Sequence, residues 1–147
     1  MEQLKIKKLN EKAKVPQRAT GGSAGLDLCA CIDAPLTLRG GETAVIPTGI
    51  AIALPSADYG AFVFARSGLA IKHGIGLLNS VGVIDSDYRG EIKVGVINQI
   101  AEPYTIEPGE RIAQMVILPV SMMPVTEVEQ LDETARGAGG FGSTGTK

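Results

Sequence analysis

Turn-forming residues divide this sequence into short pieces. Nineteen glycines and eight prolines are spread over 147 residues, and the segments between them are rich in Val, Ile, Leu and Thr. Helices usually need at least about ten uninterrupted residues, whereas strands need only about four to eight. Short β-rich segments bounded by turns are typical of an all-β sandwich or barrel, so the sequence predicts this fold class.

The alternation of apolar and polar side chains supports an all-β fold. Residues 24–32 alternate, with Leu28 on one face of an expected strand and Asp27 on the other. Only residues 67–74 have the pattern of a helix, of about two turns. The other expected strands are two short ones within 43–55, and 61–65, 90–98, 104–110, 111–120 and 126–131.

The chain has the size and composition of one globular domain. Its residues are 44% hydrophobic and 20% charged, and no apolar run approaches the roughly 18 residues of a membrane-spanning helix. The N-terminus lacks the apolar stretch of a secretory signal, so we expect a cytoplasmic protein without a membrane partner. A net charge of −2 argues against a nucleic-acid partner, because binding to duplexes requires clustered positive charge.

The cysteines and the histidine exclude several kinds of site. Cys29 and Cys31 are the only cysteines, and two of them cannot supply a structural zinc site. Because neighbours on one strand face make poor disulfide partners, we expect two free, small hydrophobic side chains in a reducing compartment. His73 is the only histidine, which rules out a histidine-rich metal site.

The last twelve residues differ in composition from the rest of the chain. RGAGGFGSTGTK contains five glycines and one isolated aromatic residue, Phe141, so it cannot bury enough apolar surface to order itself. We therefore expect a single β-rich domain over 1–135 and a mobile glycine-rich arm over 136–147. A solvated tail is the simplest interpretation. Arg136, Phe141 and the hydroxyls that follow also suit a flap over a phosphorylated aromatic ligand, because glycine lets backbone N–H groups approach phosphate closely.

A candidate anion site follows the expected strand at 61–65. Arg66 and Ser67 stand where the strand meets the expected helix, whose first backbone N–H groups have no partner within the helix. The guanidinium fork and the hydroxyl add two further donors. The set can bind an anion, although an ordinary serine cap would also explain Ser67.

Residues 82–94, GVIDSDYRGEIKV, have the pattern of a β-hairpin with many polar residues in its turn. Turn chemistry alone explains Asp87. Asp85 follows an apolar run and is expected at a strand end, partly buried, where a carboxylate can accept a proton from water. Tyr88 offers a flat face, and Asn79 offers a donor and an acceptor for the edge of a base.

Five segments that carry these residues occur in order along the chain. They are AGLDLCA (24–30), ARSGLA (65–70), GVIDSDYRGE (82–91), GERIAQMV (109–116) and RGAGGFGSTG (136–145). In these segments and their order the sequence resembles the trimeric dUTPase (dUTP pyrophosphatase) family, from residue 24 to residue 145. The resemblance implies a jelly-roll-like distorted barrel, and a homotrimer whose active sites are shared between subunits. It also implies the hydrolysis of dUTP to dUMP and pyrophosphate with Mg²⁺ on the triphosphate, which limits uracil in DNA and supplies dUMP for dTMP synthesis.

The resemblance also implies roles for the matched residues. Asp85 corresponds to the carboxylate that activates the attacking water, and Tyr88 to the residue that packs on the deoxyribose and excludes a 2′-hydroxyl. The residues expected to line a uracil slot are Asn79, Gly82, Val83, Ile84 and Lys93. Those expected to contact phosphates are Arg66, Ser67, Gly68, Gln114 and Arg136. In the arm, Phe141 would cover the uracil, while the γ-phosphate would be wrapped by Gly142, Ser143 and Thr144. Asp27 would either support the metal through water or hold the subunit interface together.

Two other functions fit the same scaffold. A dCTP deaminase shares the fold, and a non-catalytic nucleotide-binding module could use it as well. The complete segment around Asp85 and the glycine-rich arm favour the hydrolase.

Overall fold

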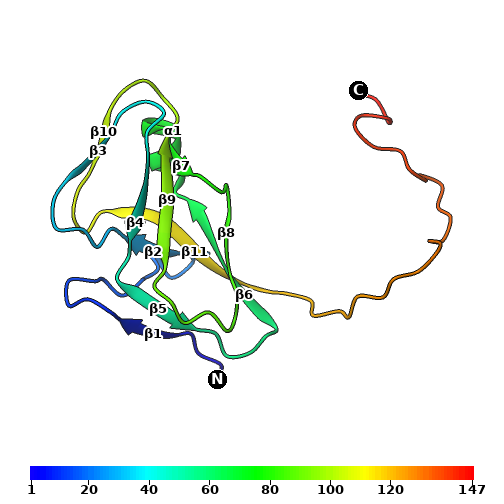
Figure 1. The fold of residues 1–147 in the computed structure, drawn as a ribbon, viewed down its shortest axis with the longest axis horizontal. Coiled ribbons are helices and arrows are strands. Elements are labelled where there is room, and N and C mark those ends of the chain that lie inside the picture. The colour runs from blue at the N-terminus through cyan, green and yellow to red at the C-terminus, as the bar shows by residue number, and fades with distance from the viewer.

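The structure, a computed structural model, describes all 147 residues and consists of short strands and one helix (Figure 1). The strands are β1 (Lys5–Lys8), β2 (Leu26–Cys29), β3 (Leu36–Leu38), β4 (Thr43–Pro47), β5 (Ile50–Ala53), β6 (Tyr59–Ala65), β7 (Ile75–Leu77), β8 (Gly82–Ile84), β9 (Lys93–Asn98), β10 (Tyr104–Ile106) and β11 (Arg111–Pro119). The helix is α1 (Ser67–His73). The predicted all-β class with at most one short helix is confirmed. No helix combines the length and hydrophobicity that crossing a membrane requires.

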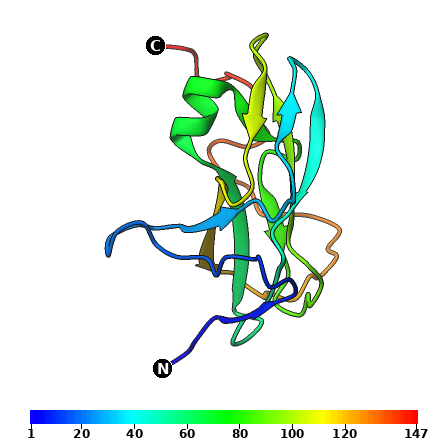
Figure 2. The same cartoon turned by 90° about the vertical axis from the view of Figure 1, so that its left-hand side faces the viewer.

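The strands pair antiparallel in four small sheets. The larger two have the strand orders β2-β11-β6-β8 and β4-β9-β7, and the other two are the pairs β1-β5 and β3-β10. The sheets do not join into one closed barrel. The helix α1 lies at the end of the body opposite the N-terminus, directly after β6 (Figure 2).

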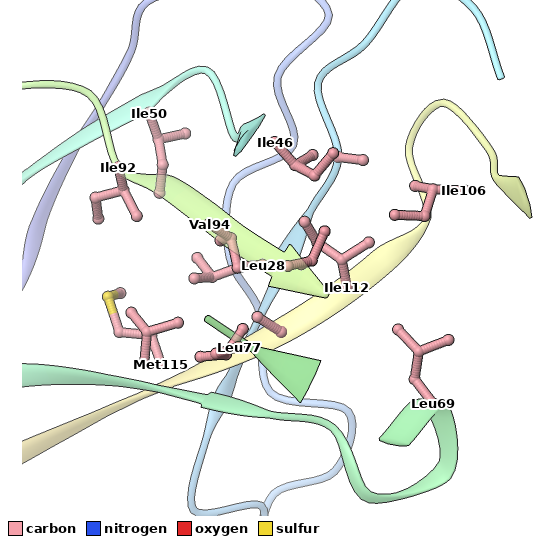
Figure 3. Close-up of a cluster of buried hydrophobic side chains, with 14 of the residues drawn as sticks. Leu28, Ile46, Ile50, Leu69, Leu77, Ile92, Val94, Ile106, Ile112 and Met115 are labelled. Atoms are coloured by element: carbon pink, nitrogen blue, oxygen red, sulfur yellow. The ribbon is translucent and has the colours of Figure 1, made fainter. Parts of the chain in front are cut away.

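The hydrophobic core fills the space between the two larger sheets (Figure 3). Leu28, Ile112 and Met115 come from the four-stranded sheet and face Ile46 and Val94 of the three-stranded sheet, and each is at most 3% exposed. Burying a side chain of this size contributes about 1.5 to 3 kcal/mol, so the core holds the two sheets together. The polar faces of β2 and β11 are thereby turned outward.

The two cysteines are free, as the sequence predicts, and both are half-buried. Burial raises the pKa of the Cys29 thiol above its ordinary value. A raised pKa keeps the thiol protonated near neutral pH, so Cys29 is a weak nucleophile and a weak metal ligand.

Residues 82–94 do not form the predicted β-hairpin. β8 pairs with β6, whereas β9 pairs with β4 and β7, so the segment crosses from one sheet to the other. Instead of pairing with β8, the residue before β9, Ile92, pairs with the turn between β4 and β5. Ile92 N donates to the Ile50 carbonyl at 2.9 Å, and the Ile92 carbonyl accepts from Thr48 N at 3.2 Å. This pairing across more than forty residues keeps β8 and β9 apart.

The strand predicted at 126–131 is also absent. After β11 ends at Pro119 the chain has no further helix or strand, and residues 121–138 are all exposed. Figure 1 shows this segment leaving the body and ending far from it. A strand needs a hydrogen-bonding partner, and a single chain offers none here. The boundary between body and arm at 135/136 stays a prediction.

Gly49, in the turn between β4 and β5, occupies a position that requires glycine, and this requirement can be tested. It has φ +69°, and a Cβ atom there would lie 2.8 Å from Cβ of Ala13 and 2.9 Å from Sγ of Cys31. We expect Gly49→Ala to lower the free energy of unfolding by about 2 to 5 kcal/mol, because backbone strain and overpacking add.

The matched control is Gly41→Ala. Gly41 has φ +81° but nothing within 4 Å of the added Cβ, so only backbone strain of about 1 to 2 kcal/mol is expected. Urea denaturation measures both variants, and equal losses would contradict the role assigned to close packing around Gly49.

Candidate active site

The gap between β8 and β9 holds a cavity of about 350 Å³, called the slot below. Its apolar floor is formed by Val63, Leu77, Ile92 and Val94. Every residue that the sequence predicts for a base-binding slot lines it, namely Asn79, Gly82, Val83, Ile84 and Lys93, and Tyr88 lines it as well. The structure therefore brings these residues together, although the hairpin that was expected to hold them is absent.

The slot has backbone hydrogen-bonding groups along one wall. β8 is the edge strand of its sheet, because it pairs with β6 on one side only. An edge strand leaves every second N–H and C=O without a partner, at a fixed spacing. A flat heterocycle in the slot could therefore form hydrogen bonds with the main chain of residues 82–84.

Tyr88 lies beside the slot and is held in one position. Its ring is 45% exposed, and its hydroxyl donates a hydrogen bond of 2.9 Å to the Glu91 carbonyl. The ring therefore offers a flat apolar face that is not used by the core.

Asp85 follows directly on β8, at the strand end where the sequence predicts it. It is exposed rather than partly buried, and it begins a turn in which Tyr88 N donates to the Asp85 carbonyl at 3.2 Å. No other side chain forms a hydrogen bond or ion pair with its carboxylate, which is free to accept a proton from water.

A second cavity of about 170 Å³, called the basic hollow below, lies where β2, β6, α1 and β11 meet. Its lining includes Arg66, Ser67, Gly68 and Gln114, which are the phosphate-binding residues predicted in the body of the protein, and also Asp27, which was predicted to support the metal or the subunit interface. The register explains their proximity, since Gln114 of β11 pairs with Asp27 on one side and with Phe64 on the other.

Asp27 bridges two arginines at the basic hollow. One carboxylate oxygen accepts from Arg66 Nε and the other from Arg111 Nη1, both at 3.2 Å. The Asp27 side chain is only 15% exposed, so these ion pairs are less screened than surface pairs. The cluster of Asp27, Arg66 and Arg111 therefore carries one net positive charge, and the carboxylate fixes the direction of both guanidinium groups.

Gln114 reaches into the basic hollow because Gly25 leaves room for it. Its Nε2 donates to the Ala65 carbonyl at 3.0 Å, and a Cβ atom at position 25 would lie 2.6 Å from its Oε1. Sequence reasoning assigned no role to Gly25. Nor did it assign one to Arg111, although Arg111 is the other polar residue in the strand that contains Gln114.

The start of α1 leaves Ser67 free to contact a ligand. Arg66 is the N-cap residue, with extended backbone angles and no side-chain capping hydrogen bond, so the alternative of a serine cap at position 67 does not apply. Ser67 and Gly68 are the first two helical residues and both are exposed.

The slot and the basic hollow lie beside different parts of β6, and Asp85 is distant from Arg66 within one chain. Val63 of β6 lines the slot, whereas Arg66, the residue directly after β6, lines the basic hollow. Ile84, next to Asp85, pairs with Ala61, and Arg66 lies five residues further along the chain. At about 3.3 Å per residue this corresponds to roughly 16 Å along the strand. The two cavities share no lining residue.

The predicted residues of the arm reach neither cavity. Phe141 is fully exposed and Arg136 Nε donates to the Gly139 carbonyl at 2.8 Å. The lining of the slot and of the basic hollow includes none of Arg136, Phe141, Gly142, Ser143 and Thr144.

The body offers no cage for a metal ion. No three His, Cys, Asp or Glu side chains lie close enough together to hold one, and both oxygens of Asp27 are engaged by arginines.

Comparison with known proteins gives a consistent result. The family model for dUTPase matches residues 11–145. The deoxyuridine 5′-triphosphate nucleotidohydrolase of Desulfitobacterium hafniense (strain DSM 10664 / DCB-2) is 57% identical, with 99% of both chains covered. The protein of the same name from Hahella chejuensis is 55% identical over 96% of this chain and 93% of the other.

Solved structures agree with this result. A point mutant of the dUTPase of Staphylococcus bacteriophage 80alpha with dUpNHpp has a TM-score of 0.88 and 28% identity, over 98% of this chain and 99% of the other. A point mutant of the dUTPase of S. aureus phage phi11, solved with a structural Mg(II) ion, has a TM-score of 0.77 and 27% identity, over 87% and 97% of the two chains. The expected jelly-roll-like fold is thereby confirmed, with sheets that do not close.

The bridging role of Asp27 predicts a loss of stability on substitution. We expect Asp27→Asn to lower the free energy of unfolding by about 1 to 3 kcal/mol, because both hydrogen-bonded ion pairs lose their charge in a half-buried place. The control is Asp33→Asn, whose single ion pair with Lys12 is exposed and screened by solvent, so its loss should change the free energy of unfolding much less. Urea denaturation measures the two variants, and equal changes would contradict the bridge.

Proposed function

The chain belongs to the dUTPase family, and on that premise we propose how its two cavities share the hydrolysis of dUTP to dUMP and pyrophosphate. Membership of the family makes the protein a dUTP diphosphatase, an enzyme that limits uracil in DNA and supplies dUMP for dTMP synthesis. The family match covers nearly the whole chain, and the relatives carry the name of this reaction. Neither alternative, a dCTP deaminase or a non-catalytic nucleotide-binding module, is favoured by these relatives.

The slot along the edge strand β8 is the observation that supports our assignment of the uracil site. Backbone donors and acceptors of residues 82–84 would pair with the polar edge of the base, and Asn79 would add a side-chain pair. A base with the wrong pattern of donors and acceptors would leave buried polar groups unpaired, which rejects cytosine. The apolar walls would leave no room for the C5-methyl group of thymine.

Tyr88 is the proposed selector for deoxyribose. Its flat, half-exposed face lies beside the slot, where the sugar of a bound nucleotide would follow the base. A ring packed against C2′ of the sugar leaves no space for a hydroxyl there, so UTP would be excluded on size.

Asp85 is the proposed general base. Its free carboxylate would accept a proton from water, and the water oxygen would form a bond to the α-phosphorus. The bond between the α-phosphorus and the bridging oxygen of the β-phosphate would break, and pyrophosphate would leave with that oxygen. In-line displacement of this kind depends chiefly on positioning and on charge stabilisation.

The basic hollow is the proposed site of the phosphate chain. Arg66, Ser67 and Gly68 would bind its oxygens with a guanidinium, a hydroxyl and backbone N–H groups, and Gln114 would add a further donor. Asp27 would hold Arg66 in the required direction, which its ion pairs support better than a direct metal contact. Mg²⁺ bound to the triphosphate would neutralise charge on the phosphate oxygens.

We propose that the active site is shared between subunits of a homotrimer. Asp85 must reach the α-phosphate while Arg66 reaches the phosphates beyond it, but roughly 16 Å of strand separates the two in one chain. The slot of one subunit could instead face the basic hollow of the next. The arm would then close over a neighbouring site, with Arg136 and the hydroxyls of Ser143 and Thr144 on the phosphates. A cytoplasmic location is proposed as well, and the two free cysteines support it.

Product analysis with four nucleotides tests the function. The purified protein is incubated with Mg²⁺ and dUTP, dCTP, dTTP or UTP, and the products are separated by ion-exchange chromatography. We expect dUMP and pyrophosphate from dUTP and no product from the other three. A uracil nucleotide formed from dCTP would identify a deaminase, and no reaction with any nucleotide would identify a binding module.

Two aspartates in the same loop provide the matched controls. Asp85→Asn should lower kcat for dUTP by about 10²- to 10⁴-fold, the usual contribution of a general base, while a non-hydrolysable dUTP analogue still binds. Asp87→Asn, at an exposed turn position, should keep the activity of the unchanged protein. Near-normal turnover by Asp85→Asn would refute its assignment.

The arm can be tested separately from the body. We expect Phe141→Ala to lower kcat/KM for dUTP by about 5- to 150-fold, which corresponds to the ~1 to 3 kcal/mol of base stacking on an aromatic ring. Truncation after Arg136 should lower it further. Because Phe141 is fully exposed in the single chain, neither change should shift Tm. A large loss of thermal stability would show that the arm belongs to the folded body.

A further inference from the structure

The ring of Tyr88 lies directly over Gly90. A Cβ atom at position 90 would lie 2.5 Å from Cζ of Tyr88, 2.9 Å from its Cε1 and closer still to its hydroxyl oxygen. Carbon atoms that are not bonded to each other need about 3.5 Å. Gly90 does not have a positive φ, so its backbone conformation suits any residue. Glycine is therefore required at position 90, because any side chain there would overlap the Tyr88 ring.

The other contact that fixes the ring is itself anchored to the core. The Tyr88 hydroxyl donates to the Glu91 carbonyl at 2.9 Å, and the Glu91 carboxylate accepts from Gly49 N at 3.2 Å. The next residue, Ile92, pairs with Thr48 and Ile50, and Thr48 is only 2% exposed. The turn between β4 and β5 thus fixes the Glu91 side chain through Gly49 and the following backbone through Thr48 and Ile50. The Glu91 carbonyl lies between these two attachments.

We propose that Gly90 and Glu91 are positioning residues for sugar specificity. Gly90 admits the Tyr88 ring over the chain, and Glu91 holds the carbonyl to which its hydroxyl is bound. Together they set the distance between the ring and the slot, and so the space left at C2′ of a bound nucleotide. This inference rests on the proposed role of Tyr88 as the residue that excludes a 2′-hydroxyl.

A purely structural role for Gly90 does not account for these contacts. The side chain that a Cβ atom at position 90 would displace is half-exposed and belongs to no buried cluster. Its displacement should therefore cost little stability, whereas it should move the surface against which the sugar packs.

The test compares kcat/KM for dUTP with kcat/KM for UTP. Both are measured with the full-length protein by monitoring the pyrophosphate released from the nucleotide. We expect Gly90→Ala to lower the ratio of the two values by at least about tenfold, the usual effect of a change of one carbon in a pocket, with Tm unchanged. The matched control is Gly21→Ala, where nothing lies within 4 Å of the added Cβ, and its ratio should stay the same. An unchanged ratio in Gly90→Ala would overturn the proposal, whatever the absolute rate.

Glu91 is tested by a pair of variants. Glu91→Ala removes the acceptor for Gly49 N and should lower the dUTP to UTP ratio, whereas Glu91→Gln keeps an amide oxygen and should retain it. Equal ratios in Glu91→Ala and the unchanged protein would overturn the part assigned to Glu91.

A Tyr88→Ala variant separates this proposal from the function on which it rests. If Tyr88→Ala loses the preference for dUTP while Gly90→Ala keeps it, Tyr88 is the selector and Gly90 does not position it. If Tyr88→Ala keeps the preference, Tyr88 is not the selector, and both the sugar site and the positioning proposal fail.

Discussion

The pairing of Ile92 with the turn between β4 and β5 is the constraint on which the site depends. Both backbone groups of Ile92 are taken by Thr48 and Ile50, so β8 has no partner on that side and remains an edge strand. The gap that results is the slot, and the unpaired groups of β8 form its wall. The apolar core between the two larger sheets fixes how far apart the two strands stand.

At the C-terminal end of β6, ion pairs rather than apolar packing position the side chains of the basic hollow. Asp27 would be an unusual choice for a site that binds phosphates if it faced them alone, since like charges repel. Its position between Arg66 and Arg111 resolves this conflict, because the carboxylate orients two cations and leaves the cluster positive. The close approach of Gly25 to Gln114 has a comparable effect on a neutral side chain, which is directed into the same hollow.

Local sequence patterns correctly predicted the elements that depend on neighbouring residues. They failed for elements whose structure depends on a partner far away in the sequence. The alternation around Leu28, the helix after Arg66 and the strand end before Asp85 were all predicted, because each follows from the residues beside it. The apolar segments on both sides of Asp85 favoured a hairpin, since nothing near them shows that Thr48 and Ile50 compete for Ile92. Residues 126–131 have the composition of a strand but find no partner within the chain. Arg111 was missed because its role arises only from its ion pair with Asp27, 84 residues away.

The edge position of β8 has a consequence for how such a protein can change over generations. A base that is recognised by main-chain atoms is indifferent to the identity of the side chains that point away from it, and Val83, for example, is 65% exposed. Substitutions of the outward-pointing Val83 would therefore leave the proposed choice of base unchanged, whereas Gly82 is constrained because an added Cβ would lie 3.1 Å from Cβ of Val63. A shift of register along β8 would move every main-chain group of the wall, and it would also disturb the pairing with β6. Base selectivity of this kind would resist gradual erosion at the exposed positions of the strand.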